Sequence, residues 1–280
     1  MQINAYYNGE LGSFGQIKLP LTDRAIFFGD GIYDAAIGRA GKIFMLREHL
    51  MRFFSNAGRL DLNPDVQEGE LEALLRRLTR LSGEKEYFLY FQLSRFSETR
   101  AHSYRKDAPA NLLVTVSPFS LPSEEKRLSL ITLPDLRYKL CDVKTLNLLP
   151  AVLASGEASQ RGADEAIFIK DGFVTECAHS NIHILKNGRL KTHPLSNEIL
   201  PGISRAHLLC VCEQLGVEVE QKAFLHEELF SADAVIVTSS SKLGMIAESI
   251  DGMPLDLSKV EMAEALCRKM REDYLSATEC

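Results

Sequence analysis

The sequence predicts a two-domain α+β protein. Apolar segments typical of strands are mixed with segments of helical spacing, without the regular alternation of a doubly wound parallel sheet. Asn-Gly or Asp-Gly pairs between apolar runs indicate antiparallel hairpins at residues 8–9, 171–172 and 187–188. With 280 residues and 45% hydrophobic content, the chain exceeds one average domain.

Residues 1–120 are predicted to form a smaller α/β domain. The first strand ends at the Asn8-Gly9 turn, and Gly29 and Gly31 indicate a tight backbone passage before a strand that runs through Ile37. Two segments then have apolar residues at helical spacing, and two β-rich segments follow. The expected elements are strands at 3–7 and up to 37, an apolar segment at 43–46, helices around 50–57 and 71–78, and strands at 87–94 and 112–116.

Residues 121–280 are predicted to form a larger, β-rich domain. The polar, proline-containing segment 121–126 separates it from the first domain. Gly162 is the expected stop of a helix that begins near Asn147. The expected elements are strands at 128–133, 166–170, 173–176, 181–185, 190–192 and 234–238, with helices at 147–161, 202–215 and 257–274.

The charge and cysteine pattern excludes several classes of protein. A net charge of -6 argues against nucleic acid or an anionic membrane as the main partner, since both require a basic surface. No signal peptide is visible, and no apolar run approaches the ~20 residues that cross a bilayer. The six cysteines show neither CxxC nor metal spacing, so we expect no metal site and a reducing cytoplasm.

Lys144 lies at the boundary between a polar segment and an apolar one. Cys141-Asp142-Val143 precede it, and the run from Thr145 to Ala154 is largely apolar. A lysine at such a boundary tends to be partly desolvated, which disfavours the ammonium form and frees the amine as a nucleophile. Such an amine can form a Schiff base with an aldehyde such as pyridoxal 5′-phosphate.

The other groups that this cofactor needs follow in order. It requires an acid at the pyridine nitrogen, and its phosphate prefers a helix N-terminus and hydroxyl groups. Glu176 ends a predicted strand, Pro201-Gly202-Ile203-Ser204-Arg205 opens a predicted helix, and Thr238-Ser239-Ser240-Ser241 follows a predicted strand. From about Tyr7 to the C-terminal helix, the chain resembles the fold-type IV pyridoxal-phosphate enzymes. These include D-amino-acid aminotransferase, branched-chain aminotransferase and aminodeoxychorismate lyase.

The resemblance implies a role for each matching residue. Lys144 forms the Schiff base and shuttles the proton, and Glu176 keeps the pyridine nitrogen protonated. By the same resemblance the phosphate is bound by Arg52, Ile203, Ser204 and Ser240, and Leu200 supports the cofactor ring.

A second set of residues indicates the subfamily. Arg100-Ala101-His102, downstream of Tyr90-Phe91-Gln92, is similar to the carboxylate-binding motif of D-amino-acid aminotransferases, and Tyr33 matches its third member. A guanidinium can hold a carboxylate by two hydrogen bonds, while a histidine and a phenol each add a donor. The resemblance implies amino transfer from a D-amino acid such as D-alanine to a 2-oxo acid such as 2-oxoglutarate, by a homodimer.

Two departures and three alternatives accompany this interpretation. Asp34 stands where the family usually carries Glu, and His179 where D-amino-acid enzymes typically have a small hydroxyl residue. His179 can narrow the site beside the cofactor or titrate there, so this departure bears on substrate range and rate. The alternatives are an aminodeoxychorismate lyase, an L-branched-chain aminotransferase, and a non-catalytic small-molecule-binding module that keeps the fold.

Overall fold

A computed structural model describes residues 3–279 of the chain, which divides into two compact units. The first comprises residues up to 120, the segment 143–147 and the residues from 276 onward; the second comprises 121–142 and 148–275. Lys144 therefore belongs to the first unit, whereas the division by sequence assigned it to the second. Within residues 3–279, no helix has both the length and the apolar character needed to span a bilayer.

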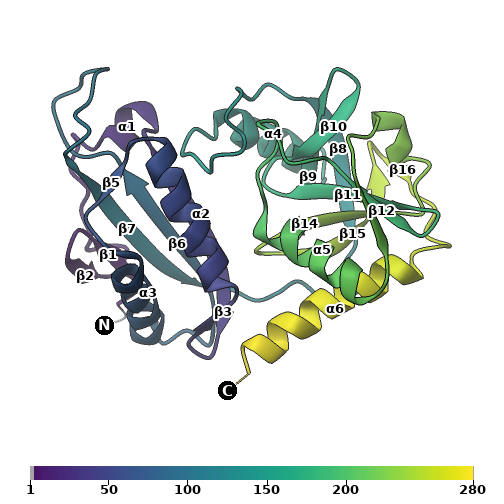
Figure 1. Ribbon diagram of the computed structural model, residues 1–280, viewed down its shortest axis with the longest axis horizontal. Helices are drawn as coiled ribbons and strands as arrows, with labels where there is room; N and C mark the ends of the chain where they lie inside the picture. Colours follow the sequence, from purple (N-terminus) through teal and green to yellow (C-terminus); the bar gives the residue numbers. More distant parts are fainter. Residues whose placement is uncertain (1–2, 280) are drawn as a thin grey trace. The chain divides into compact units, whose positions relative to one another are not determined.

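A seven-stranded sheet forms the frame of the first unit, in the order β2-β1-β7-β6-β3-β4 with β5 beside β7. Its long strands β3, β6 and β7 pair antiparallel. Helices α2 and α3 pack on it (Figure 1). The elements are β1 (Ala5–Tyr7), β2 (Glu10–Gly12), α1 (Arg24–Phe28), β3 (Gly31–Arg39), β4 (Lys42–Ile43), α2 (Leu46–Arg59), β5 (Asn63–Pro64), α3 (Glu68–Ser82), β6 (Glu86–Ser94) and β7 (Pro109–Pro118).

The helical spacing read from the sequence is the buried face of α2 and α3. Leu50, Phe53 and Ala57 of α2 are buried, and they share a core with Leu71 and its neighbours on α3. These apolar stripes cover the inward residues of the sheet and hold the two helices against it. The predicted apolar segment 43–46 is divided in the structure, because β4 ends at Ile43 and α2 begins at Leu46.

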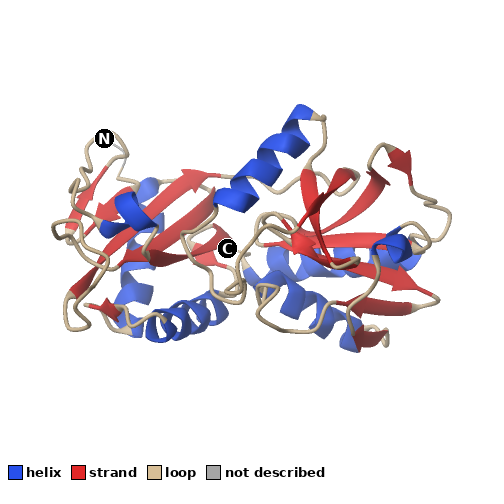
Figure 2. Cartoon of the chain, turned by 90° about the horizontal axis from the view of Figure 1, so that it is seen from above, coloured by secondary structure: helices blue, strands red, loops and turns tan. Residues whose placement is uncertain are grey.

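The second unit contains a nine-stranded sheet, in the order β10-β9-β8-β15-β14-β11-β12-β13 with β16 beside β15. β8 lies parallel to both β9 and β15, and β12 lies parallel to β13, so the sheet combines parallel pairs with the antiparallel hairpins predicted from the sequence. Figure 2 shows the strands and the helices that flank them. The elements are β8 (Leu128–Pro134), α4 (Leu149–Gln160), β9 (Glu165–Lys170), β10 (Phe173–Cys177), β11 (Asn181–Lys186), β12 (Arg189–Thr192), α5 (Ile203–Gln214), β13 (Glu218–Gln221), the 3-10 helix η1 (His226–Leu229), β14 (Ala234–Ser239), β15 (Leu243–Ile250), β16 (Met253–Pro254) and α6 (Glu261–Ala277).

The hairpin predictions are confirmed. Asp171 and Asn187 have φ of 52° and 50°, and each is followed by a glycine that also has positive φ. These turns connect β9 to β10 and β11 to β12, and both strand pairs are antiparallel. The turns match the right-handed twist of the strands that they join.

The tight passage predicted at Gly31 positions the segment that carries Lys144. A Cβ at Gly31 would lie 2.2 Å from the carbonyl oxygen of Leu93, so only glycine fits between the neighbouring segments of the chain. The Gly31 carbonyl accepts from the Leu146 amide at 3.0 Å, and the Tyr33 amide donates to the Lys144 carbonyl at 2.9 Å. Segment 143–147 is thus bound along the start of β3.

Candidate active site

Lys144 and Tyr33 lie together in the first unit. The Lys144 Nζ lies 4.4 Å from the centroid of the Tyr33 ring, and this ring stacks on Tyr90 with centroids 5.4 Å apart. Lys144 is half-buried and forms no ion pair with any residue between 3 and 279. Its amine therefore faces an aromatic ring rather than a carboxylate.

Asp34, the first departure from the family pattern, binds the predicted phosphate ligand Arg52. The fully buried Asp34 carboxylate accepts from Arg52 Nε and Nη2, both at 2.8 Å, and lies 2.7 Å from His49 Nδ1. Burial opposes the charge, yet Arg52 and His49 outweigh it and hold the pKa of Asp34 well below its usual range. The aspartate side chain is thus long enough to reach Arg52, and the ion pair fixes the orientation of the Arg52 side chain on α2.

Arg100 and His102 lie in the loop between β6 and β7. The Arg100 guanidinium carbon lies 5.0 Å from the centroid of the Phe28 ring, and the His102 ring is 5.4 Å from the same ring. The structure thus brings Arg100 and His102 together on one aromatic side chain. No hydrogen bond or ring contact within the described chain joins Tyr33 to either of them.

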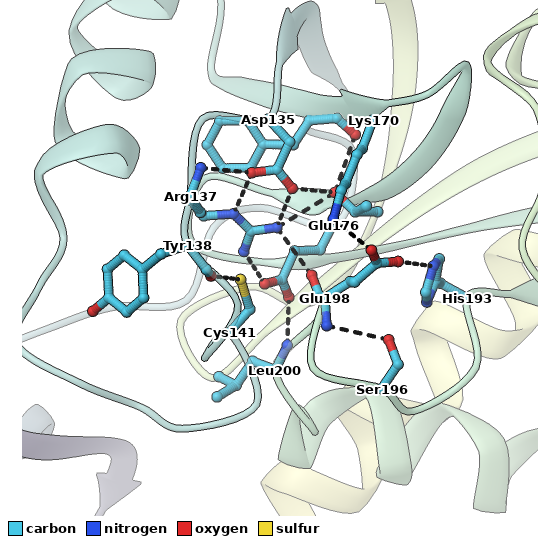
Figure 3. A network of polar contacts seen from close by, with 12 residues as sticks. Asp135, Arg137, Tyr138, Cys141, Lys170, Glu176, His193, Ser196, Glu198 and Leu200 are labelled. Carbon is cyan, nitrogen blue, oxygen red and sulfur yellow. Dashed lines mark hydrogen bonds and ion pairs between the residues drawn. The ribbon is translucent and has the colours of Figure 1, made fainter.

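Glu176 lies at an irregularity of the β9–β10 hairpin, and its side chain is held from three sides. The register of the two strands shifts between Val174 and Cys177, which re-aims the side chains of this stretch. The carboxylate is buried, with 5% of the residue exposed. Its Oε1 accepts from Arg137, and its Oε2 accepts from the Leu200 amide at 3.0 Å (Figure 3). Oε2 also accepts from Asn181 Nδ2 at 2.9 Å.

Arg137 is a site residue that the sequence did not reveal. Its guanidinium lies between Glu176 and Asp135, with Nη2 2.7 Å from Asp135 Oδ2 (Figure 3). The guanidinium carbon also lies 4.7 Å from the centroid of the Phe168 ring. Burial opposes its charge, but the two carboxylates raise the pKa of Arg137 above its usual range. Arg137 lies in an irregular loop between a strand and Lys144, where no periodicity marks it.

The N-terminus of α5 presents main-chain amides without a side-chain cap. Gly202 is the N-cap residue, and no side chain accepts from the first turn. A Cβ at Gly202 would lie 2.0 Å from Asn181 Oδ1, so a side chain is excluded there. Ile203 and Ser204, which open the helix, are buried. Helix N-termini of this kind attract phosphate through their amides and dipole.

Ser240 lies in the turn after β14, at the same end of the sheet. β14 and β11 pair so that Thr238 is opposite Asn181, whose side chain contacts Gly202. Around Ser240 the hydroxyl oxygens of Ser239 and Ser241 are 3.3 Å apart. The hydroxyl-rich turn and the start of α5 are therefore neighbours within the second unit.

His179, the second departure, pairs with a buried acid. Its Nδ1 lies 3.2 Å from Glu165 Oε1, and its side chain is 49% exposed. Glu165 also accepts from the Ser180 hydroxyl at 2.9 Å and pairs with Lys242 at 3.0 Å. Glu165, at the start of β9, thereby binds two turns: the one that contains Ser180, after β10, and the one that contains Lys242, after β14.

The groups described suit pyridoxal 5′-phosphate. Glu176 offers a buried carboxylate as acceptor for a pyridinium nitrogen, with the Arg137 guanidinium beside it. The amides at the start of α5 and the adjacent hydroxyl turn offer donors for a phosphate. Lys144 offers an amine that no carboxylate of the described residues engages. Among these same residues, no cluster of three His, Cys, Asp or Glu side chains could hold a metal ion.

Comparison with known proteins decides the family. The model of amino-transferase class IV matches residues 31–250. The chain belongs to this family. It is 34% identical over 251 residues to a D-alanine aminotransferase of Bacillus licheniformis, covering 89% of both chains. It is also 34% identical over 273 residues to one of Staphylococcus aureus, covering 96% of this chain and 95% of the relative.

Solved structures agree on the fold. A branched-chain aminotransferase from Thermoproteus uzoniensis has a TM-score of 0.90 at 22% identity, covering 99% of this chain and 98% of the other. The predictions of a fold-type IV α+β enzyme with pyridoxal 5′-phosphate as cofactor are confirmed. The non-catalytic alternative is set aside, because the class IV aminotransferases are enzymes.

The buried His183 should make the stability of the protein depend on pH. Burial, with a smaller contribution from Arg205, lowers the pKa of His183 to about 3, and its ring lies 2.8 Å from Thr192 Oγ1 and 2.9 Å from Thr238 Oγ1. Between pH 6.5 and 3 the unfolded chain binds a proton at this histidine that the folded chain does not. This group should therefore lower the free energy of unfolding by about 1.4 kcal/mol per pH unit as the pH falls through that window.

Denaturant unfolding of the wild type and a His183→Gln variant at several pH values checks this. The free energy of unfolding of the variant should fall less steeply as the pH is lowered. The difference between the two slopes should correspond to about one proton taken up on unfolding. Equal slopes would mean that the folded protein protonates His183 normally.

Proposed function

We propose that the chain transfers the amino group of a D-amino acid, such as D-alanine, to a 2-oxo acid, such as 2-oxoglutarate. The observation that carries this proposal is its 34% identity, over 96% of its length, to a D-alanine aminotransferase. The motif Arg100-Ala101-His102 supports the same substrate class. The branched-chain aminotransferases are less similar in sequence, at 22% identity for the Thermoproteus protein, and support the fold alone.

Lys144 is proposed to carry the cofactor and to move the proton at the substrate Cα. Bound pyridoxal phosphate supplies an electron sink for the electrons of the Cα–H bond. The amine of Lys144 takes this proton and returns it, beside the ring of Tyr33. Glu176 would hold a proton on the pyridine nitrogen, and its ion pair with Arg137 would keep the carboxylate in place for this task.

The phosphate is proposed to lie against the start of α5. Ile203 and Ser204 would donate there from the helix N-terminus, and Ser240 from the neighbouring turn. Arg52 would add a charge that Asp34 keeps in one orientation. Leu200 would support the ring, since its amide and carbonyl are both bound, to Glu176 and Asn181 respectively.

Arg100, His102 and Tyr33 are proposed to bind the substrate carboxylate. Lys144 acts from one face, so the Cα–H bond must point toward it whichever enantiomer reacts. The choice of enantiomer then depends on where the carboxylate is held. A guanidinium and an imidazole on one loop provide a charged contact and a further donor for that group.

A cytoplasmic homodimer is proposed as the working form. Leu149, Val152 and Leu153, on the first turns of α4, are 68%, 60% and 63% exposed, and exposed apolar faces of this kind are typical of subunit interfaces. Sedimentation should report twice the chain mass of 31.3 kDa. Replacing Leu149 and Leu153 by Glu should favour the single chain, and a wild-type protein of single-chain mass would contradict the dimer.

The attachment site can be tested by chemistry and by exchange of the lysine. The purified protein should be yellow, and borohydride should fix the pyridoxyl group on the peptide that contains Lys144. Lys144→Ala should lose nearly all turnover while still binding the cofactor without a covalent link. Lys139→Ala, at a nearby lysine, is the matched control and should keep both activity and label. Label on a different lysine would end the assignment.

The substrate class is tested with a panel of D- and L-amino donors against 2-oxoglutarate, for the wild type and Arg100→Ala. D-alanine should react, and the variant should lose roughly ten- to a hundredfold in kcat/KM with D-alanine and with 2-oxo acids alike, because both present a carboxylate. The cofactor spectrum should not change. Preference of the wild type for L-leucine or L-isoleucine over all D donors would contradict the proposed substrate.

A further inference from the structure

The loop that carries Arg100 and His102 has little regular structure of its own. Residues 99–108 form neither helix nor strand between β6 and β7. A loop of this kind presents two side chains in a defined direction only if something else fixes its backbone. Arg24, the first residue of α1, is in contact with this backbone.

Three consecutive carbonyls of the loop converge on the Arg24 guanidinium. Nη1 donates to the Ala101 carbonyl at 2.5 Å and to that of Ser103 at 3.4 Å, while Nη2 donates to the His102 carbonyl at 3.4 Å. These carbonyls belong to the peptide units 101–102, 102–103 and 103–104, so the two units that flank His102 are bound, and the first bound unit begins one residue after Arg100. Because a guanidinium is planar and rigid, it limits the rotation of all three units at once.

Arg24 is itself held firmly. It is 4% exposed, its Nε donates to Asp30 Oδ2 at 2.8 Å, and its guanidinium covers the Phe28 ring at 4.7 Å. Phe28 is also the ring against which Arg100 and His102 lie. One turn of helix therefore provides both the cation that binds the loop backbone and the ring that supports its two side chains.

A second arginine keeps the charge of Asp30 balanced. Arg95 Nε lies 2.9 Å from Asp30 Oδ2, and its Nη atoms donate to the carbonyls of Leu60 and Asp61. If Arg24 changes, Asp30 still has a cation beside it, so the loss falls mainly on the loop. Arg24 can therefore be replaced without leaving the partly buried charge of Asp30 unpaired.

We propose that Arg24 is a positioning residue for substrate recognition, which orients Arg100 and His102 toward the substrate α-carboxylate by binding the backbone of residues 101–103. This role rests on the proposed function, because it requires that the two side chains bind the carboxylate. It concerns substrate affinity and leaves the chemistry at Lys144 unchanged.

The test compares Arg24→Lys with the wild type. Lysine keeps the positive charge near Asp30 but is a single point donor, so it cannot hold three carbonyls. The KM values for D-alanine and 2-oxoglutarate should rise about tenfold, with a smaller change in kcat. The inhibition constant of propionate, the carboxylate that D-alanine becomes without its amino group, should rise by the same factor. Cofactor absorbance and the unfolding midpoint should stay near those of the wild type.

Arg105→Lys is the matched control, because Arg105 is in the same loop but is exposed and pairs with Glu98 at 3.9 Å. It should leave KM and the propionate constant unchanged. Arg24→Gln, for which the same rise is expected, provides the second variant should Arg24→Lys fail to fold.

A double variant separates positioning from a general effect on the fold. If Arg24 acts through Arg100, adding Arg24→Lys to Arg100→Ala should raise KM by less than about threefold, because the contact to be positioned is already gone. Full additivity, or a fall in kcat with unchanged KM, would overturn the positioning role. An unchanged Arg100→Ala variant would instead overturn the carboxylate role in the proposed function. An impaired Arg100→Ala beside an unchanged Arg24→Lys would overturn the role of Arg24 alone.

Discussion

The ion pair between Arg137 and Glu176 is the interaction on which the second unit's site depends. A carboxylate removed from water is stable in its charged form only when a cation and hydrogen-bond donors replace the lost hydration. Arg137 provides the cation, and the Asn181 side chain and the Leu200 amide provide donors. Asp135 in turn balances Arg137. Four separate chain segments are thereby joined at one acid.

The first unit uses the same principle twice. Asp34 binds Arg52 through two nitrogen atoms, and Asp30 lies between Arg24 and Arg95. Asp34 is fully buried and Asp30 is partly buried. Asp34 fixes Arg52, the predicted phosphate ligand, and Asp30 binds Arg24, which contacts the backbone of the loop that carries Arg100. Removing either aspartate should cost several kcal/mol of unfolding free energy, since arginines that are largely buried would be left without their counter-charge. The geometry of these sites is therefore tied to the stability of the units that carry them.

The sequence was sufficient for the features that depend on local patterns. The stripe through Leu50, Phe53 and Ala57 predicted α2, and Asn187-Gly188 predicted a hairpin, because spacing and turn chemistry are written in neighbouring residues. β13, β15 and the short helix α1 were missed, as was the parallel pairing of β8. The strands and the parallel pairing depend on contacts between distant segments. Helix α1 begins at the cap residue Asp23 and has only five residues, too few to show a helical periodicity in the sequence.

For the site, ordered motifs indicated Lys144, Glu176 and the start of α5, but not the residues that support them. Arg137 and Arg24 act on partners 39 and 77 positions away, at Glu176 and Ala101. Each is one charged residue in a short or irregular segment, so nothing in its neighbourhood distinguishes it from a solvated surface residue.

The contact between Gly202 and Asn181 has a consequence for the size of the molecule that the second unit can accept. Asn181 donates through Nδ2 to Glu176, and its Oδ1 lies where any side chain at residue 202 would have to be. The side-chain amide of Asn181 thus contacts both Glu176 and the beginning of α5, and it sets the spacing between them. If the proposed cofactor lies here, with its ring nitrogen at Glu176 and its phosphate at the start of α5, enlarging or shortening the side chain of residue 181 would change the spacing of these two contacts together.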